Sequence, residues 1–485
     1  MKKVLLIAFY FNQTNEIASK RLRGLAKYLP QFGWETIVVV PRLDDTSSKN
    51  AKYDLKVIET DYVDMLDKWL NKFKISSKKT SNNSNIITEP NNKFHPHKRD
   101  SNRIKESNNK FNSYKINLND IGENKNLKKK TVANSEVFNK LLPKVISLAG
   151  ELFAYPDGMK YWYTPAIEAS CEIIEKNKDI KGIISSSWPV TSHIIAKDLK
   201  KQFNIPWIAD LRDLWNMNPY ISHNFIRSYF EKRLELKTFE SVDILTTTTE
   251  LAALNLKKLH PNAKIYPIVS GFDPEDFSDI ENSYGFDKKN QNISYQNNKL
   301  NFTYAGSLYG GKRDPNLLFK GLSQLIDEGK IDSSKIALDF YGDSENLEKI
   351  ATKYSIREIL NIHGLISQKE VLAKQKESQV LLLISWNNKK EEMFIPGKIY
   401  EYFAVKRPIL SIGYKDGSLK DLIKETNVGY HVSTLSQTKG TLIKLYNDFM
   451  LNKTLKYEGN DKVNSYSMIN TAKKFGKILD SIDNS

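Results

Sequence analysis

The segment from Val380 to Ala404 constrains the fold of this chain more than any other. It begins with five consecutive apolar residues that end at Ile384, and after a polar stretch it continues from Ile395 as IPGKIYEYFA. A strand that is apolar on both faces is typical of a parallel sheet covered by helices on both sides. Because proline is favoured in the first turn of a helix, we expect a buried strand, a loop and a helix that begins at Pro396.

The start of that helix has the chemistry of a nucleotide-sugar site. The first backbone N–H groups of a helix lack partners and lie at the positive end of its dipole, so they attract an anion such as phosphate. Lys398 adds a positive charge there, and Glu401 can accept hydrogen bonds from sugar hydroxyls. The sequence therefore predicts that Pro396, Gly397, Lys398 and Glu401 bind a nucleotide-diphosphate sugar.

Apolar strands alternate with helical patterns along most of the 485 residues. In the first part, residues 4–9, 22–32 and 36–40 read as a strand, a helix and a second strand, which favours a parallel sheet. A polar patch over 287–299 reads as a linker, and a fresh series of strands begins at Phe302. We therefore expect the α/β class, with two doubly wound Rossmann-like domains that face each other across a cleft.

The expected boundaries place the first domain at 1–290, the second at 296–470 and a C-terminal tail at 471–485. Two domains are expected because single cores rarely grow beyond about 250–300 residues. The formal charge is +16, and the window 71–140 holds 16 Lys and Arg against 6 Asp and Glu, a surplus of ten. This window also holds 16 Asn. We therefore expect a basic, mostly disordered insertion over about 76–131.

Several stretches resemble the retaining glycosyltransferases of family 4, which have the GT-B fold. The helix that starts Glu401-Tyr402-Phe403-Ala404 is similar to that family's Glu-Ala-Met-Ala helix. Further similar stretches are 9–11, 19–21, 25–29, 33–35, 207–213, 270–274, 407–410 and 426–429. The likeness covers most of the chain apart from about 63–150. It implies transfer of a sugar from a nucleotide-diphosphate donor to a glycan or lipid-linked acceptor in surface polysaccharide biosynthesis.

The resemblance also implies donor-binding residues in the second domain. In the family, a glycine-led loop that ends in a basic residue contacts the pyrophosphate. Here Gly306 closes a strand and Lys312 and Arg313 follow. We favour Arg313 of the two, because Arg-Asp-Pro heads the next helix in similar enzymes. An ordinary exposed turn is the alternative for this loop.

One family position differs in this chain. The family's two signature acids are separated by seven residues, and counting back from Glu401 gives Met393, which is not an acid. Glu391 and Glu392 lie one or two positions away, and either one can replace the missing acid. We place Glu392 in the donor site. A solvated charge pair beside the neighbouring lysines is the alternative.

In the first domain, three residues that follow apolar strands are candidates for catalysis: His193, Asp210 and Asp213. Imidazole titrates in a range suited to proton transfer, and a carboxylate can act as the base for an acceptor hydroxyl. Arg21 and Arg212 are candidates for the acceptor site or the loop over the cleft. The alternatives are a structural His193 and an internal ion pair of Arg212 with Asp210 and Asp213 that fixes the loop.

The sequence predicts no metal and no cofactor. No Asp-x-Asp pair follows a strand in a suitable place, so we expect basic residues to stabilise the leaving diphosphate instead. Cys171 is the single cysteine, which excludes an internal disulfide and indicates a reducing, cytoplasmic compartment. An isomerase or epimerase of nucleotide sugars with the same fold is an alternative function.

The basic composition raises two questions about partners. Nucleic-acid binding is an alternative, but most of the excess charge lies in the predicted insertion and no basic motif with interleaved aromatics appears, so we expect no nucleic-acid partner. The apolar segment 141–155 has a basic rim. It reads either as a surface that contacts an anionic membrane, which would make the protein peripheral on the inner face, or as a helix packed on its own domain.

Overall fold

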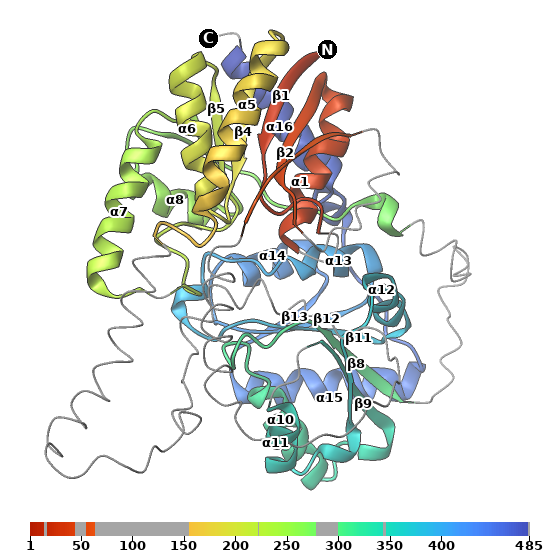
Figure 1. Ribbon diagram of the computed structural model, residues 1–485. Coiled ribbons are helices and arrows are strands. Elements are labelled where there is room, and N and C mark those ends of the chain that lie inside the picture. Colours follow the sequence, from red (N-terminus) through yellow and green to blue (C-terminus); the bar gives the residue numbers. More distant parts are fainter. Residues whose placement is uncertain are drawn as a thin grey trace, which may run out of the picture.

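The structure is a computed structural model that describes residues 1–13, 17–43, 55–63, 155–221, 223–277, 299–342 and 346–483. The predicted insertion over 76–131 and nearly all of the apolar segment 141–155 lie outside these residues. The described chain forms one sheet of seven strands and one of six, each flanked by helices (Figure 1). The predicted α/β class with two doubly wound domains is therefore confirmed.

The first sheet is parallel throughout, in the order β3-β2-β1-β4-β5-β6-β7. Its strands are β1 (Lys2–Ile7), β2 (Trp34–Pro41), β3 (Lys56–Thr60), β4 (Ile180–Ser186), β5 (Trp207–Leu211), β6 (Ile244–Thr247) and β7 (Lys264–Pro267). The helices of this domain are α1 (Ile17–Tyr28), α5 (Tyr163–Lys176), α6 (Thr191–Phe203), α7 (Phe225–Phe239) and α8 (Glu250–Leu259), with short 3-10 turns at Leu29–Phe32 and Lys160–Trp162. The strand order reverses between β1 and β4, and ligands of such sheets bind at the carboxyl ends of the strands beside that point.

The second sheet is also parallel, in the order β10-β9-β8-β11-β12-β13. Its strands are β8 (Leu300–Ala305), β9 (Ile336–Tyr341), β10 (Leu360–Gly364), β11 (Val380–Ile384), β12 (Ile409–Ile412) and β13 (Gly429–Val432). Its helices are α10 (Asn316–Asp327), α11 (Leu347–Lys353), α12 (Gln368–Glu377), α13 (Lys398–Val405), α14 (Ser418–Thr426) and α15 (Leu435–Asn452), with 3-10 turns at Ser333–Lys335, Arg357–Ile359, Lys389–Glu391 and Asp461–Ser465. Here the order reverses between β8 and β11.

Strand β11 and helix α13 follow the prediction from sequence closely. All five residues of β11 are buried; Leu382 packs into the core on one face of the sheet and Leu383 into the core on the other. Helix α13 begins at Lys398, two residues later than predicted, after a turn in which Ile399 N donates to Pro396 O at 3.1 Å. The amino-terminal end of this helix, where we expect an anion to bind, therefore consists of Gly397 and Lys398.

The C-terminal residues do not form the tail that we expected over 471–485. They belong to helix α16 (Met468–Asp483), which returns to the first domain and packs against α1 (Figure 1). Met468 and Phe475 are buried in the same core as α1 and β1. Because apolar residues recur at helical spacing along α16, the helix has a face that must be buried, and the first domain supplies the surface for it.

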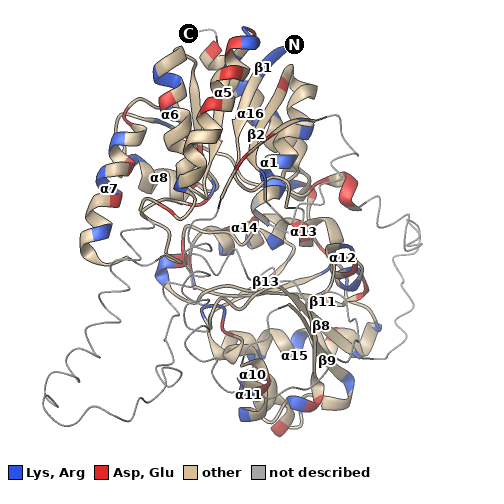
Figure 2. Ribbon diagram, viewed as in Figure 1, with Lys and Arg blue, Asp and Glu red and all other residues tan. Residues whose placement is uncertain are grey.

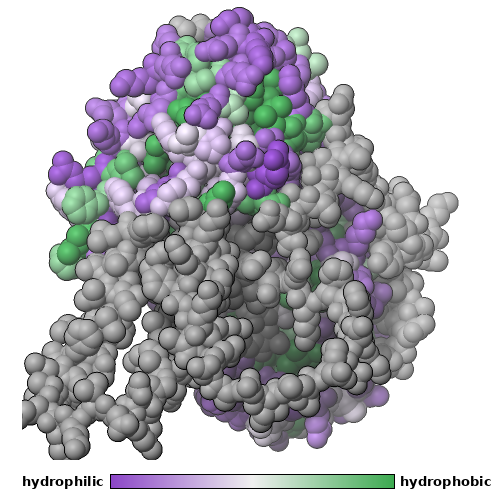
Figure 3. All heavy atoms as spheres, in the orientation of Figure 1, coloured by the Kyte–Doolittle hydropathy of each residue, from purple (hydrophilic) through white to green (hydrophobic). Residues whose placement is uncertain are grey.

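The surface of the molecule is mixed in charge. Lys, Arg, Asp and Glu lie along the outer helices of both domains (Figure 2). The visible surface of the first domain mixes hydrophilic and hydrophobic areas, and hydrophobic side chains at the lower end of α7, at the left edge of the domain, form one of the hydrophobic areas (Figure 3).

Candidate functional site

Gly306 and Lys398 come together at the carboxyl ends of β8 and β11. The Lys398 side chain is buried, donates to Ala305 O at 2.6 Å and lies 4.0 Å from the centre of the Tyr304 ring. Gly306 has a φ of 137°, and a Cβ on it would lie 2.6 Å from Lys398 Nζ. Glycine is therefore needed at this position both for its backbone conformation and to let the ammonium approach.

Lys312 and Arg313 lie beside this point on the loop after β8. Lys312 reaches the first domain, where it donates to Pro219 O at 3.0 Å, and its ammonium lies about 5 Å from the ring centre of Tyr220. Burial lowers the pKa of Lys312. The guanidinium of Arg313 lies 4.1 Å from the ring centre of Tyr309, and its buried Nε has no partner among the described residues. Arg313 thus has donor capacity left for a ligand.

Glu391, rather than Glu392, lies beside Lys312 and Arg313. We refer to Arg313, Lys398, Glu391 and Glu401 as the charged cluster. The Glu391 side chain is buried, and Oε1 accepts hydrogen bonds from Tyr220 at 2.7 Å and from Ser385 at 3.0 Å. Oε2 has no partner among the described residues. Burial raises the pKa of Glu391, although the charge of Arg313 acts in the opposite direction. Of the two glutamates that the sequence offered, the structure therefore places the one that we did not choose beside the basic residues.

Glu401 and Lys20 form an ion pair that joins the two domains. Lys20 lies on α1 and Glu401 on α13, and both side chains are about one fifth exposed. The lower end of α1 faces α13 in Figure 2. Glu401 thus lies at the edge of the second domain that faces the first, and a ligand hydroxyl that bound it would compete with Lys20.

Arg21 and Asp210 form an internal ion pair, which the sequence did not predict: the expected alternative paired Asp210 or Asp213 with Arg212. The Arg21 guanidinium donates to both Asp210 carboxylate oxygens at 2.9 Å, and both side chains are almost completely buried. Thr246 and Ser186 also donate to this carboxylate. Burial alone would raise the pKa of Asp210, but the charge and hydrogen bonds of Arg21 outweigh it and the pKa lies below its usual value. Neither side chain is accessible to an acceptor or a phosphate.

His193 is also a buried structural group rather than a cleft residue. It lies in the first turn of α6, where Nδ1 is 2.8 Å from Ser185 Oγ and the ring packs edge-on against Phe239. Burial lowers the pKa of His193 to about 3, so the imidazole is neutral at physiological pH. Its Nε2 has no hydrogen-bond partner among the described residues and is buried.

Arg212 and Asp213 follow β5, with the Arg212 side chain largely covered and that of Asp213 at the surface. Arg212 Nε donates to the backbone oxygen of Ser187, and its guanidinium lies 3.6 Å from the Asp213 carboxylate. The Asp213 side chain is 44% exposed. Of the three catalytic candidates, only Asp213 is therefore accessible from solvent.

A cavity of about 250 Å³ adjoins the cluster on the side of the first domain. It is lined by Trp188, Trp215, Asn216, Asn218, Ile221, His223, Ser228, Glu231 and Lys232. Pro219 contacts Lys312 and Tyr220 contacts Glu391. Their chain neighbours Asn218 and Ile221 line the cavity, so the cavity lies next to these two contacts. Trp188 Nε1 is buried and has no partner among the described residues. We refer to this space as the indole cavity.

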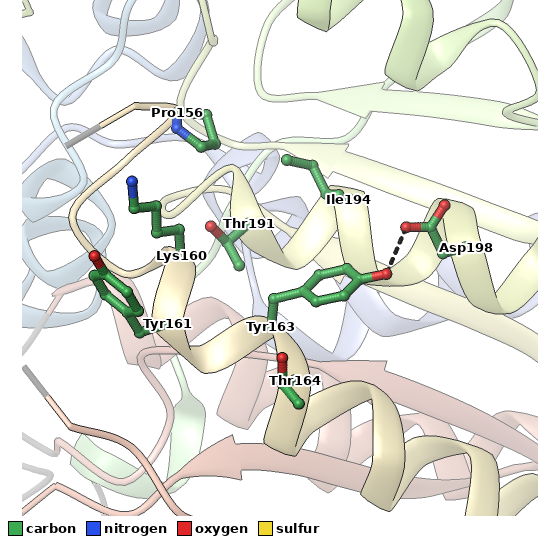
Figure 4. A pocket seen from close by; sticks show the side chains of 8 residues that line it. All are labelled: Pro156, Lys160, Tyr161, Tyr163, Thr164, Thr191, Ile194 and Asp198. Atoms are coloured by element: carbon green, nitrogen blue, oxygen red, sulfur yellow. Dashed lines mark hydrogen bonds between the residues drawn. The ribbon is translucent and has the colours of Figure 1, made fainter. Parts of the chain in front are cut away.

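A larger cavity of about 460 Å³ lies between the starts of α5 and α6 (Figure 4). Its lining includes Lys160, Tyr161 and Tyr163, and the Tyr163 hydroxyl donates to Asp198 at 2.8 Å (Figure 4). None of the residues predicted from the sequence lines either cavity. The lining of the larger cavity contains none of the charged residues around Arg313, whereas the indole cavity adjoins them in the chain.

Sequence reasoning missed several residues around the charged cluster. Lys20 is adjacent to Arg21, but no pattern distinguished it as the partner of Glu401. Tyr220 lies in a loop of the first domain without regular spacing, and only the fold brings it against Glu391. Trp386, whose ring centre is 4.9 Å from Lys312 Nζ, follows β11 directly, and its place after a strand was the available signal.

Two further properties concern the described residues as a whole. Within them, no group of three or more His, Cys, Asp or Glu side chains is arranged to hold a metal ion. Among the described helices, none has both the length and the apolar character required to cross a bilayer.

The fold is shared with solved structures of glycosyltransferases. A sucrose-phosphate synthase from Thermosynechococcus elongatus aligns over 99% of both chains with 13% identity and a TM-score of 0.59. An α,α-trehalose 6-phosphate synthase from Burkholderia multivorans covers the same shares with 11% identity and a TM-score of 0.58. The lipopolysaccharide outer core galactosyltransferase WaaB also covers 99% of both chains, with 11% identity and a TM-score of 0.52. No protein-family model and no curated protein sequence matches this chain. The likeness establishes the GT-B fold.

Proposed function

We propose that this protein is a glycosyltransferase that moves a sugar from a nucleotide-diphosphate donor to a glycan or lipid-linked acceptor, with retention of configuration and without a metal ion. The observation that carries the proposal is the cluster of Arg313, Lys398, Glu391 and Glu401. It lies at the point where the order of the second sheet reverses, the usual ligand-binding position of such sheets. The shared GT-B fold supports the reaction class, and the cluster supports the donor.

The donor diphosphate would bind between Arg313 and the start of α13. The guanidinium has a buried N–H to donate, and Gly397 and Lys398 carry the backbone N–H groups that precede the hydrogen-bonded turn at the positive end of the helix. Lys398 holds the loop at Gly306 and adds a positive charge. These cations would stabilise the charge that develops on the diphosphate as the bond to the sugar breaks, which is the work a metal ion does in other transferases.

The two glutamates would orient the rest of the donor. Glu401 has the position to accept hydrogen bonds from the nucleotide ribose, in exchange for its contact with Lys20. Glu391 has an unpaired carboxylate oxygen beside Arg313 and would accept hydrogen bonds from hydroxyls of the transferred sugar. Both roles follow from the fact that a buried or half-buried carboxylate oxygen requires a donor.

The acceptor would enter from the indole cavity. In the transfer, the bond between the anomeric carbon and the diphosphate oxygen breaks and a bond to the acceptor oxygen forms. Because Asp210 is buried in an ion pair with Arg21 and His193 is buried in the core, a diphosphate oxygen of the leaving group would take the acceptor proton, on the same face of the sugar. Transfer on one face retains the configuration of the anomeric carbon.

The proposal is tested with Glu391→Gln and with the neighbouring Glu392→Gln as its matched control. With nucleotide sugars and a mixture of oligosaccharide acceptors, we expect Glu391→Gln to lower kcat/KM by about 100-fold or more, because one hydrogen bond to a charged group contributes about 1.5–3 kcal/mol and the substitution disturbs two existing ones. Glu392→Gln should change it by less than about threefold. Equal effects of the two substitutions would contradict the assignment.

Metal independence is tested on the same reaction. Turnover should persist in excess EDTA, because Arg313 and Lys398 supply the positive charge at the diphosphate. Loss of turnover on chelation, with recovery on addition of Mg²⁺ or Mn²⁺, would show that a metal binds the donor and that these side chains do not replace it.

A further inference from the structure

Helix α7 has its polarity inverted with respect to the domain that it belongs to. Its inward face is charged over most of its length: Glu231 is buried, accepts from Trp215 Nε1 at 2.6 Å and pairs with Arg227, while Glu235 is buried and contacts His260. Leu234 and Phe239 pack inward near its carboxyl end. Its outward face carries large apolar side chains. The aromatic side chains Phe225, Tyr229 and Phe230 are 83%, 56% and 52% exposed, and Ile226 and Leu236 are exposed beside them.

This inversion requires an explanation, because burial of apolar surface is the dominant favourable contribution to folding. A helix whose charged residues are paired inside and whose aromatic residues face outward gains nothing from those aromatics as an isolated domain. Contiguous apolar side chains on a surface mark a contact with a partner. In Figure 3 the hydrophobic area at the lower end of α7 is visible at the edge of the first domain.

The charges around this face indicate what kind of partner it fits. Lys232, Arg233 and Lys237 are exposed on the same helix, and Glu240 just beyond its end is the exposed acid nearby. Arg233 donates to the Tyr229 hydroxyl at 2.9 Å, so the basic and aromatic side chains lie together. An aromatic stripe bordered by Lys and Arg matches the boundary of an anionic bilayer, where rings enter the headgroup region and cations contact lipid phosphates.

We propose that the outward face of α7 docks on an anionic lipid surface. A second copy of this chain is a poorer match, because a 15-residue helix is about 22 Å long and about 10 Å wide, so its face covers about 220 Å². A stable dimer buries about 800 Å² per partner. The paired charges under α7, together with Leu234 and Phe239 near its carboxyl end, then have a function: they hold the helix on the domain without using its exposed aromatic side chains.

The docking orientation has a consequence that rests on the proposed function. Ser228, Glu231 and Lys232 of α7 line the indole cavity, where we place the acceptor. A membrane held by the outward face of the same helix would bring the headgroup of a lipid-linked acceptor to that cavity. The docking itself does not depend on sugar transfer and can be measured without any donor.

The test is co-sedimentation with vesicles of phosphatidylcholine alone and of phosphatidylcholine with phosphatidylglycerol, at ~0.15 M salt. We expect the full chain to bind the anionic vesicles. The variant Phe225→Ser/Tyr229→Ser/Phe230→Ser should lower the partition coefficient about tenfold or more, because all three rings lose contact with the bilayer boundary. The matched control Leu254→Ser/Leu365→Ser/Leu451→Ser changes three exposed leucines on other parts of the surface and should change it less than twofold.

A charge variant tests the second half of the proposal. Arg233→Glu/Lys237→Glu should lower binding to anionic vesicles about tenfold or more and leave binding to neutral vesicles unchanged. Its control, Lys320→Glu/Lys349→Glu, has the same charge change on exposed lysines of the second domain. Circular dichroism of every variant establishes that the helices are retained.

Three outcomes would overturn the proposal. The first is that the wild-type protein does not bind anionic vesicles. The second is that the aromatic variant binds as the leucine control does. The third is that sedimentation velocity shows a dimer that only the aromatic variant disrupts, with no change in vesicle binding. If vesicles bind through α7 but no nucleotide sugar binds at all, the proposed function fails and the docking surface stands.

Discussion

At the scale of single residues, the pair of Arg21 and Asp210 shows how a charged cluster can serve the fold rather than the reaction. Two charges are stable inside a protein only when their remaining hydrogen-bond capacity is satisfied, and here the carboxylate has four donors. The pair ties α1 to the carboxyl end of β5. It therefore fixes the side of the first domain that faces the cleft.

The first prediction concerns this pair. Asp210→Asn should lower the free energy of unfolding by about 3–5 kcal/mol, because it leaves the buried Arg21 guanidinium without a counter-charge. Lys374→Ala, which breaks the surface pair with Glu377, should change it little. Urea unfolding measures both. If Asp210→Asn were as stable as wild type but inactive, the carboxylate would be catalytic after all.

The second prediction concerns His193 and pH. Its pKa of about 3 in the folded protein lies below the ~6.5 of an unfolded histidine, so the unfolded state binds one more proton between these values. The stability that the neutral imidazole contributes is present above about pH 6.5 and is lost as the pH falls, by about 1.4 kcal/mol per pH unit.

His193→Gln should reduce the slope of the unfolding free energy against pH between pH 4 and 6. The reduction should correspond to roughly one proton fewer taken up on unfolding. An unchanged slope in His193→Gln would show that the ring is already protonated in the folded state.

At the scale of elements, the loop after β8 and the start of α13 depend on each other. Gly306 and Gly310 both have positive φ, but a Cβ meets Lys398 only at Gly306. Gly306→Ala should therefore weaken binding of the nucleotide-sugar donor about tenfold or more relative to Gly310→Ala. Both substitutions strain the backbone, but only the one at Gly306 also displaces the Lys398 ammonium. Calorimetric titration with the donor measures this. Equal affinities would mean that Lys398 has no part in donor binding.

Helix α16 is the second element with a testable role. Phe475 is fully buried against the first domain, so Phe475→Ala should lower the free energy of unfolding by about 3–5 kcal/mol. Leu451→Ala, at a residue that is 82% exposed, is the control and should have almost no effect. A small effect at Phe475 would mean that α16 detaches readily and contributes little to the first domain.

The prediction from sequence was most accurate for elements whose evidence is local. Strand β11 is apolar over its whole length, and α13 was located within two residues because proline and glycine mark its start. The sequence did not predict the return of α16 to the first domain. An amphipathic pattern indicates that one face of a helix is buried, but it does not indicate which part of the protein covers that face. The same limit applies to the site. Gly306 and Lys398 follow the neighbouring strands β8 and β11, so their proximity could be predicted from the sequence. The contact of Tyr220 with Glu391 could not, because it depends on how the two domains face each other.

At the scale of the whole molecule, the cluster lies where the two domains touch. Lys312 contacts Pro219, Tyr220 contacts Glu391, and Lys20 pairs with Glu401, so each of these second-domain site residues has a partner on the first domain. A donor that binds there replaces some of these contacts with its own. In the proposed reaction the two domains would enclose the donor and the acceptor together, which would exclude water and align the reacting atoms.

The central claim, that a nucleotide-diphosphate sugar binds at this cluster, is tested most directly by calorimetric titration of UDP-, GDP-, ADP- and CMP-sugars into the wild-type protein, Arg313→Ala and Arg357→Ala. Arg357 is a surface arginine of the second domain that pairs with Glu348 and serves as the control. We predict that at least one nucleotide-diphosphate sugar binds the wild type, that Arg313→Ala weakens it by about tenfold or more, and that Arg357→Ala leaves it unchanged. Absence of binding by every sugar nucleotide, or equal affinities of the two variants, would contradict the account.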